Sequence, residues 1–107
     1  MMRLALALLA LTAAAAPAPA QPDANYPDRP VRIVVPFPAG SATDIVSRVM
    51  AQKFSARLGQ QFIVENRTGA SGTVGTDLVA KAKPDGYTWA LIGNAQAANV
   101  SLNDDMP

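Results

Sequence analysis

The alternation of strand and helix signals constrains the fold of this chain most. Short runs rich in β-branched and aromatic residues occupy 31–35, 62–65 and 87–92, and Pro, Gly or Asn follows each of them. Helical periodicity fills the segment between Ser41 and Gly59 and the segment 73–83. This strand–helix–strand–helix–strand order predicts the α/β class, with a parallel sheet and crossover helices.

The first helix carries both a start and a stop signal. Ser41 and Asp44 have the S-x-x-D spacing of a capping box, in which each side chain can bond the other's backbone amide. Gly59 stands where a helix C-terminus favours a left-handed residue. The apolar residues between them are predicted to form one stripe: Ile45, Val46, Val49, Met50, Phe54 and Leu58. In the second helix the corresponding residues are Val74, Leu78, Val79 and Ala82.

The residue types that are missing exclude most enzymatic chemistry. The chain has no His and no Cys, so it cannot assemble a Ser-His-Asp triad or ligate zinc through those side chains. The segment 69–73 fails the nucleophile-elbow pattern, because Thr73 replaces the last Gly of G-x-S-x-G. Neither the loop around Gly40 nor the G-x-x-G-x-x-G of 69–75 is a nucleotide-binding fingerprint. We therefore predict no catalytic residue, no cofactor and no metal.

The first 20 residues read as a secretory signal peptide. Arg3 supplies the positive charge, 4–11 is apolar, and Ala18-Pro19-Ala20 is a typical cleavage pattern before Gln21. The alternative is a membrane anchor, but the apolar run is short of the about 20 residues that a span needs. We expect a periplasmic protein with no direct membrane insertion after cleavage, in which 21–30 is an extended, Pro-containing leader.

The charge balance argues against nucleic acid as a partner. Arg3 is one of the nine basic residues, so eight remain after cleavage and match the eight acidic residues. The two signs are interspersed along the chain and no basic block stands out.

Two glycine-containing loops suggest a binding site. Each of the first two strands leads into such a loop and then into a helix N-terminus, and parallel strands place both loops at one edge of the sheet. Helix N-termini favour anions, and Gly allows close approach of the backbone. In the alternative interpretation the glycines only make turns and Ser41 with Asp44 only caps a helix. Asp44 is the most ambiguous residue, because its charge would repel an anion beside it.

Four blocks of the sequence resemble the Bug family of receptors for tripartite tricarboxylate transporters. They are YPDRPVRIVVPFPAG at 26–40, ATDIV at 42–46, VENRTGASG at 64–72 and KPDGYT at 83–88. The resemblance implies a type II periplasmic-binding-protein fold, in which two α/β lobes close over a small organic acid. It also implies that 31–107 is a truncated first lobe, and that the bound carboxylate passes to membrane transporter subunits.

The resemblance further implies which residues bind the ligand. Such receptors hold a carboxylate with backbone amides and waters from the loops that correspond here to 36–44 and 66–73. This sequence departs from the usual pattern by placing Ser41 and Ser71 where glycine is common. The candidate ligand-binding residues are Phe37, Ala39, Gly40, Ser41, Thr43, Asp44, Ala70, Ser71, Gly72, Thr73 and, after the third strand, Asn94.

Two other interpretations stay open at the level of sequence. The chain could be the lobe of a secreted α/β enzyme whose catalytic residues lie elsewhere, or a non-functional truncated remnant. Residues 101–107 lack a closing helix or strand pattern, so we expect a fragment of a longer receptor.

Overall fold

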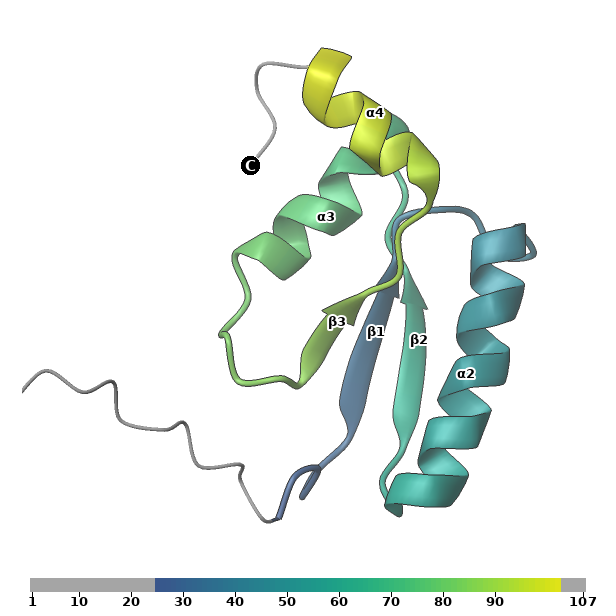
Figure 1. Cartoon of the computed structure of the whole chain (residues 1–107), viewed down its shortest axis with the longest axis vertical. Coiled ribbons are helices and arrows are strands. Elements are labelled where there is room, and N and C mark those ends of the chain that lie inside the picture. The colour runs from purple at the N-terminus through teal and green to yellow at the C-terminus, as the bar shows by residue number, and fades with distance from the viewer. Residues whose placement is uncertain (1–24, 103–107) are drawn as a thin grey trace, which may run out of the picture.

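A computed structural model describes residues 25–102, which form a three-stranded parallel sheet flanked by helices (Figure 1). The predicted signal peptide and residues 103–107 lie outside the described residues. The elements follow in the order β1 (Val31–Val35), α2 (Ala42–Leu58), β2 (Phe62–Asn66), the 3₁₀ turn η1 (Ala70–Gly72), α3 (Thr73–Ala80), β3 (Thr88–Ala90) and α4 (Asn94–Leu102). The predicted α/β class with a parallel sheet is confirmed.

Strand β1 is the centre of the sheet, and the strand order is β2-β1-β3. Its residues pair in parallel with both neighbours, so that Ile33 lies beside Val64 of β2 and Trp89 of β3. A strand with neighbours on both sides and helices over its faces is apolar along its length. Val31, Val34 and Val35 are accordingly inaccessible to solvent.

The core lies between the sheet and α2. Val31 and Ile33 of β1 pack there with Phe62 and Ala51, and Phe54 and Trp89 close around them. The rings of Phe54, Phe62 and Trp89 contact one another at centroid distances of 5.3 to 5.6 Å, which joins α2, β2 and β3. Such aromatic contacts add to the area that they bury.

The face that α2 turns to the sheet differs from the predicted apolar stripe. The buried residues of the helix are Asp44, Ser47 and Ala51, whereas Val46 and Val49 are about half exposed, at 51% and 53%. Ser47 can be buried because its hydroxyl donates to the Thr43 carbonyl oxygen at 2.7 Å. Of the predicted stripe, Phe54 packs against the core, whereas the other members are exposed. Small residues bring the rest of this helix close to the strands.

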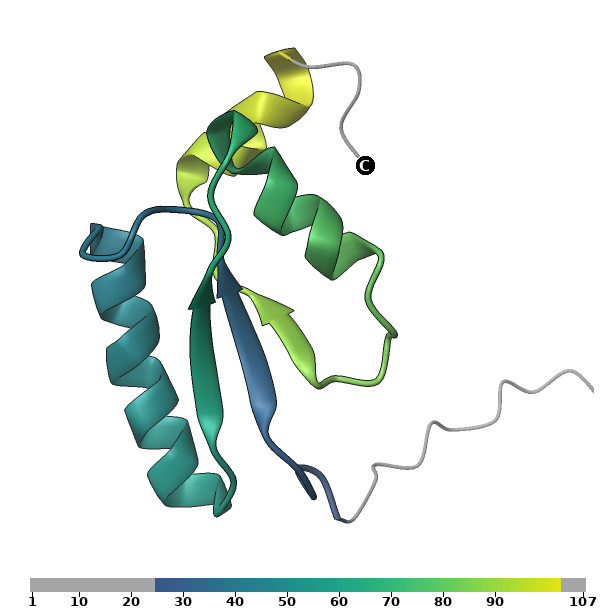
Figure 2. The ribbon, with the colours of Figure 1, turned by 180° about the vertical axis from the view of Figure 1, so that it is seen from behind.

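The second helix is shorter than predicted, and a glycine allows it to pack closely against neighbouring backbone. Helix α3 packs on β3 and β1 and ends at Ala80 (Figure 2). Gly75 is its buried residue, and a Cβ there would stand 2.7 Å from the Arg67 carbonyl oxygen and 2.8 Å from Pro36 Cβ. Val74, predicted to lie on the apolar side, is half exposed.

The bounds of two strands and the presence of a last helix also differ from the prediction. Strand β3 is shorter than the predicted run 87–92, and β2 extends one residue further, to Asn66. A helix that the sequence did not suggest, α4, follows β3 and includes Ser101 and Leu102. Within residues 25–102 no helix combines the length and apolar character that crossing a bilayer requires.

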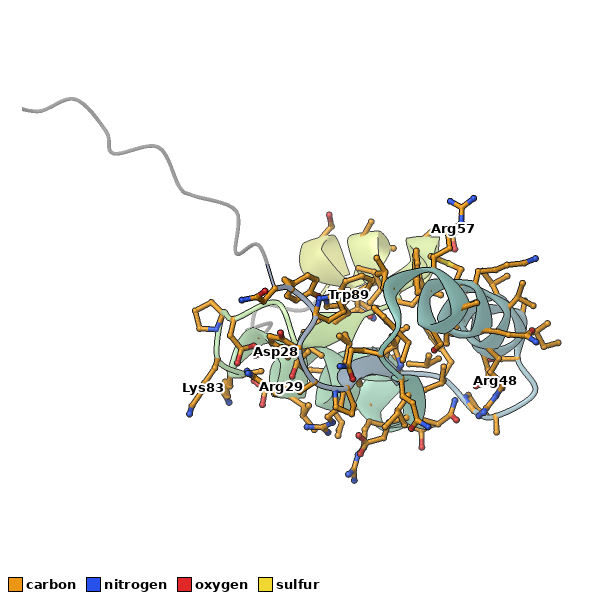
Figure 3. All side chains as sticks on the ribbon, turned by 90° about the horizontal axis from the view of Figure 1, so that it is seen from below. Asp28, Arg29, Arg48, Arg57, Lys83 and Trp89 are labelled. Carbon is orange, nitrogen blue, oxygen red and sulfur yellow. The ribbon has the colours of Figure 1, made fainter. Side chains whose placement is uncertain are left out.

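The described part of the leader runs beside the start of β3. The ring of Tyr26 meets that of Tyr87 edge-on at 5.0 Å, and the Tyr87 hydroxyl donates to the Asp28 carboxylate at 2.7 Å. The Arg29 guanidinium lies over the Tyr87 ring and pairs with Asp85 at 3.2 Å. Figure 3 labels Asp28 and Arg29 at this end of the molecule. These contacts fix the chain where it enters β1.

Candidate ligand-binding site

Three loops leave the sheet at the carboxyl ends of its strands. Val35 pairs with Asn66 at the ends of β1 and β2, and the Arg67 amide continues the ladder by donating to the Val35 carbonyl oxygen at 2.9 Å. On the other side the Leu91 amide donates to the Val34 carbonyl oxygen at 3.0 Å. Helices α2, α3 and α4 begin beyond these loops, so three N-termini gather at one edge (Figures 1 and 2). The sequence predicted two of them.

The first loop is closed by Gly40 and Ser41. Gly40 has a φ of 86°, which a residue with a Cβ rarely adopts, and its amide donates to Asp44 Oδ2 at 2.9 Å. Ser41 has an ordinary extended backbone and its hydroxyl accepts from the Asp44 amide at 3.3 Å. The predicted cap by Ser41 is thus confirmed, but the reciprocal bond reaches Gly40 rather than Ser41.

Asp44 lies at the centre of a polar network that joins the first two loops. Its side chain is almost fully buried, and it accepts from Arg48 Nε at 3.0 Å and from Asn66 Nδ2 at 3.0 Å. Asn66 Nδ2 also donates to the Phe37 carbonyl oxygen at 3.0 Å. The Arg48 hydrogen bond, followed by those from Gly40 and Asn66, lowers the pKa of Asp44 from 3.8 to about 2. With three protein donors, this carboxylate is well explained as part of the scaffold.

The second loop runs through an unusual backbone. Gly69, Ala70, Ser71 and Gly72 all have positive φ, with values of 45° at Ala70 and 56° at Ser71. Non-glycine residues pay a steric cost in this region. Ser71 therefore occupies a left-handed position that glycine adopts more readily. Ala70 and Ser71 are exposed at this turn, whereas Gly72 is buried and leads into Thr73 at the start of α3.

The third loop brings α4 against the other two. A Cβ at Gly93 would be 3.9 Å from Thr43 Oγ1, so this loop lies beside the start of α2. Asn99 Nδ2 donates to the Ser71 carbonyl oxygen at 2.9 Å. Gln96, in the first turn of α4, is 3% exposed, and its Oε1 is 3.0 Å from the position of a Cβ on Gly72. The sequence analysis missed Gln96, because a lone Gln has no motif.

A shallow hollow opens between the first and third loops. Its volume is about 300 Å³, and Ala42, Thr43, Val46, Leu91 and Ile92 line it. Thr43 is the predicted site residue that contributes, and the other four were not predicted. The lining is mainly apolar, which suits the carbon skeleton of a small organic molecule beside the amides of helix N-termini.

The remaining predicted residues lie in the first loop and at the start of α4. Ala39 is exposed in the first loop, and Asn94 is exposed at the start of α4. Phe37 contributes its carbonyl oxygen to Asn66 rather than a side chain to the hollow. Among residues 25–102, no three acidic side chains converge as a metal site.

A parallel sheet whose loops open at one edge onto three helix N-termini is the arrangement at which open α/β proteins commonly bind ligands. The family model for the tripartite tricarboxylate transporter family receptor, TctC, matches residues 46–106. The chain belongs to this family of receptors.

Similar proteins agree in sequence and in fold. BugT of Bordetella pertussis is 44% identical over 79 residues, which are 74% of this chain and 24% of BugT. MatC of Rhodopseudomonas palustris, solved with bound malate, is 38% identical with a TM-score of 0.69 over 76% of this chain and 28% of MatC. Rpa4515 of R. palustris, solved with adipate, is 43% identical with a TM-score of 0.60 over 61% of this chain and 22% of its own.

The chain spans about a quarter of the length of the curated relatives that it matches. Its family consists of receptors that are not enzymes, so the interpretation as an enzyme lobe is set aside.

Proposed function

We propose that this protein is the periplasmic receptor that captures a small carboxylated solute for a tripartite tricarboxylate transporter. The observation that carries the proposal is the convergence of three loops and three helix N-termini at one sheet edge in a chain of this family. Helix N-termini present unpaired amides and a partial positive charge, so they favour an anion. The relatives solved with malate and with adipate have dicarboxylates as ligands.

In this proposal the backbone binds the carboxylate and the side chains hold the backbone in place. The amides of Ala42, Thr43, Ala70 and Ser71 face the ligand, directly or through water. Those of Ser41, Gly72 and Thr73 already donate to the carbonyl oxygens of Pro38, Gly69 and Ala70 and hold the two loops in shape. Asp44 serves as a positioning residue, because its oxygens are engaged by Gly40, Arg48 and Asn66. The apolar hollow beside Thr43 receives the carbon chain of the acid.

Binding can be tested by calorimetry on the full-length protein with malate, adipate and citrate. Malamide, the uncharged diamide of malate, is the matched control, since it keeps the carbon skeleton and removes both charges. We expect at least one of the acids to bind and malamide not to bind. Equal binding of malamide, or no binding of any acid, would contradict a carboxylate receptor.

Export is tested separately. If residues 1–20 are a cleaved signal, the N-terminus of the protein recovered from the periplasm should be Gln21 or a near neighbour. Cell fractionation followed by N-terminal sequencing measures this. A soluble product in the cytoplasm that retains Met1 would contradict the periplasmic location without bearing on ligand binding.

A further inference from the structure

Gln96 is a buried polar side chain, and nothing in its surroundings explains why this residue is polar. It is 3% exposed, and within residues 25–102 neither its Nε2 nor its Oε1 has a hydrogen-bond partner. Buried side-chain amides almost always have partners, and an unpaired one destabilises the fold. A residue that serves only to fill space here would more favourably be apolar.

The position of Gln96 places it at the proposed site. It lies in the first turn of α4, one of the three helices that begin at the carboxyl edge of the sheet. Its carboxamide oxygen lies against Gly72 of the second loop, since a Cβ on Gly72 would be 3.0 Å from Gln96 Oε1. The same Cβ would be 3.5 Å from Pro36 Cβ of the first loop. The unpaired amide therefore lies where all three loops come together.

We propose that Gln96 is a ligand-binding residue whose Nε2 donates a hydrogen bond to a carboxylate oxygen of the captured acid. This inference rests on the proposed function and adds a side chain to a site otherwise made of backbone amides. Gln96 is buried beside the turn at Gly72, so the acid reaches its amide when that turn shifts. The bound acid then supplies the acceptor that Nε2 lacks.

The same geometry explains why the residue opposite Gln96 is glycine. Gly72 has a φ of 92° and is buried, and any side chain on it would occupy the space between its backbone and Gln96 Oε1. A side chain at residue 72 would press on the carboxamide, and glycine avoids this contact because it has no Cβ. Gly72 and Gln96 thus act as a pair.

The test replaces the amide with an apolar group of similar length. We expect Gln96→Met to weaken malate or adipate about 10- to 100-fold in calorimetry on the full-length protein, the loss of a hydrogen bond to a charged group. The melting temperature without ligand should stay the same or rise, because the variant removes an unpaired polar group. The control is Gln52→Met, the same change at an exposed position of α2, which should leave affinity unchanged.

The outcomes separate this inference from the proposed function. If the wild-type protein binds none of the acids, the proposed function fails. If the wild type binds and Gln96→Met binds equally well, only the role of Gln96 is overturned. A variant that loses binding together with its melting transition is resolved by a second measurement. In that case the side-chain amide proton signals of Gln96 in the wild-type protein should shift on addition of malate while those of Gln52 do not, and unshifted Gln96 signals would overturn the role.

Discussion

Asp44 shows at the residue scale how one carboxylate can organise two loops. Its two oxygens accept from Gly40, Arg48 and Asn66, which come from the first loop, from α2 and from the end of β2. The sequence left open whether Asp44 caps a helix or contacts the ligand. The structure favours a role in holding the loops, because a ligand would have to compete with three protein donors for this carboxylate. Spacing could suggest the cap but not the partner Asn66, which is distant in sequence.

The lowered pKa of Asp44 predicts a dependence of stability on acid pH. The folded chain keeps this carboxylate charged down to about pH 2, whereas an unfolded chain protonates it near its ordinary pKa of 3.8. Its contribution to the free energy of unfolding is therefore complete above pH 3.8 and is lost as the pH falls toward 2. We expect Asp44→Asn to lower the melting temperature at pH 7 and to flatten its decline below pH 4.

Thermal melts between pH 2 and 7 measure this effect. Glu65 contributes a similar dependence, because its hydrogen bond from Arg32 lowers its pKa despite partial burial, so the decline should be reduced rather than abolished. Asp77→Asn, which removes a partly exposed carboxylate paired with Lys81, is the control. If the melting temperature of Asp44→Asn declined with acid pH as it does in the wild type, the hydrogen-bond network around Asp44 would be contradicted.

Ser71 provides a second prediction at this scale. Its φ of 56° costs a non-glycine residue about 1–2 kcal/mol, part of which is returned as greater freedom of glycine in the unfolded chain. We expect Ser71→Gly to stabilise the protein by roughly 0.5–1 kcal/mol in denaturant unfolding. Ala56→Gly, in the right-handed backbone of α2, should instead destabilise it by about 1 kcal/mol. A loss of stability with Ser71→Gly would mean that interactions of the Ser71 side chain stabilise the fold by more than its left-handed backbone costs.

At the scale of elements, Gly75 determines how closely α3 approaches the sheet. Alanine normally stabilises a helix relative to glycine by about 1 kcal/mol. Here a Cβ would collide with the Arg67 carbonyl oxygen and with Pro36, both of them backbone or ring atoms that cannot rotate away. We therefore expect Gly75→Ala to destabilise the protein by about 1–3 kcal/mol, the usual cost of overpacking.

Denaturant unfolding of Gly75→Ala tests this, with Gly93→Ala as the matched control. A Cβ at Gly93 has its nearest contact 3.9 Å away, at Thr43 Oγ1, so alanine fits there. If Gly75→Ala proved as stable as the wild type, α3 would have to be less tightly packed than the structure has it.

The elements differ in how well local pattern predicts them. The three strands and α2 follow from β-branched runs, prolines and caps, which act over a few residues. Helix α4 could not be predicted in this way, because Asn94–Leu102 is short, contains two Asn and a Ser, and has no capping box. The buried face of α2 was also missed. Hydrophobic periodicity depends on polarity, whereas packing here selects small residues such as Ser47 and Ala51. The hydroxyls of Ser47 and Ser55 donate to carbonyl oxygens within the helix.

At the scale of the whole molecule, α2 presents apolar side chains to solvent. Ile45, Val46 and Val49 lie together on it, each more than half exposed. Adjacent exposed apolar residues promote association. In the 107-residue chain on its own we expect concentration-dependent association that Val49→Lys suppresses without lowering the melting temperature, since Val49 makes little contact with the core.

Light scattering across a concentration series, combined with thermal melts, measures both effects. Gln52→Lys adds the same charge to an exposed polar position of α2 and is the control. Association that persists in Val49→Lys, or a marked loss of its melting temperature, would show that this face is not the one responsible.

The position of β1 in the sheet also bears on when the chain can fold. Among residues 25–102 it is the first strand to be synthesised, yet both of its neighbours come later, and β3 begins only at Thr88. The β1–β2 pairing spans α2, and the β1–β3 pairing spans α2, β2 and α3, so neither can begin as a hairpin. Such non-local contacts form slowly. In the exported protein that we propose, this delay has a use. A chain that must be threaded unfolded through a translocation channel gains time, because its sheet cannot close until the third strand has arrived.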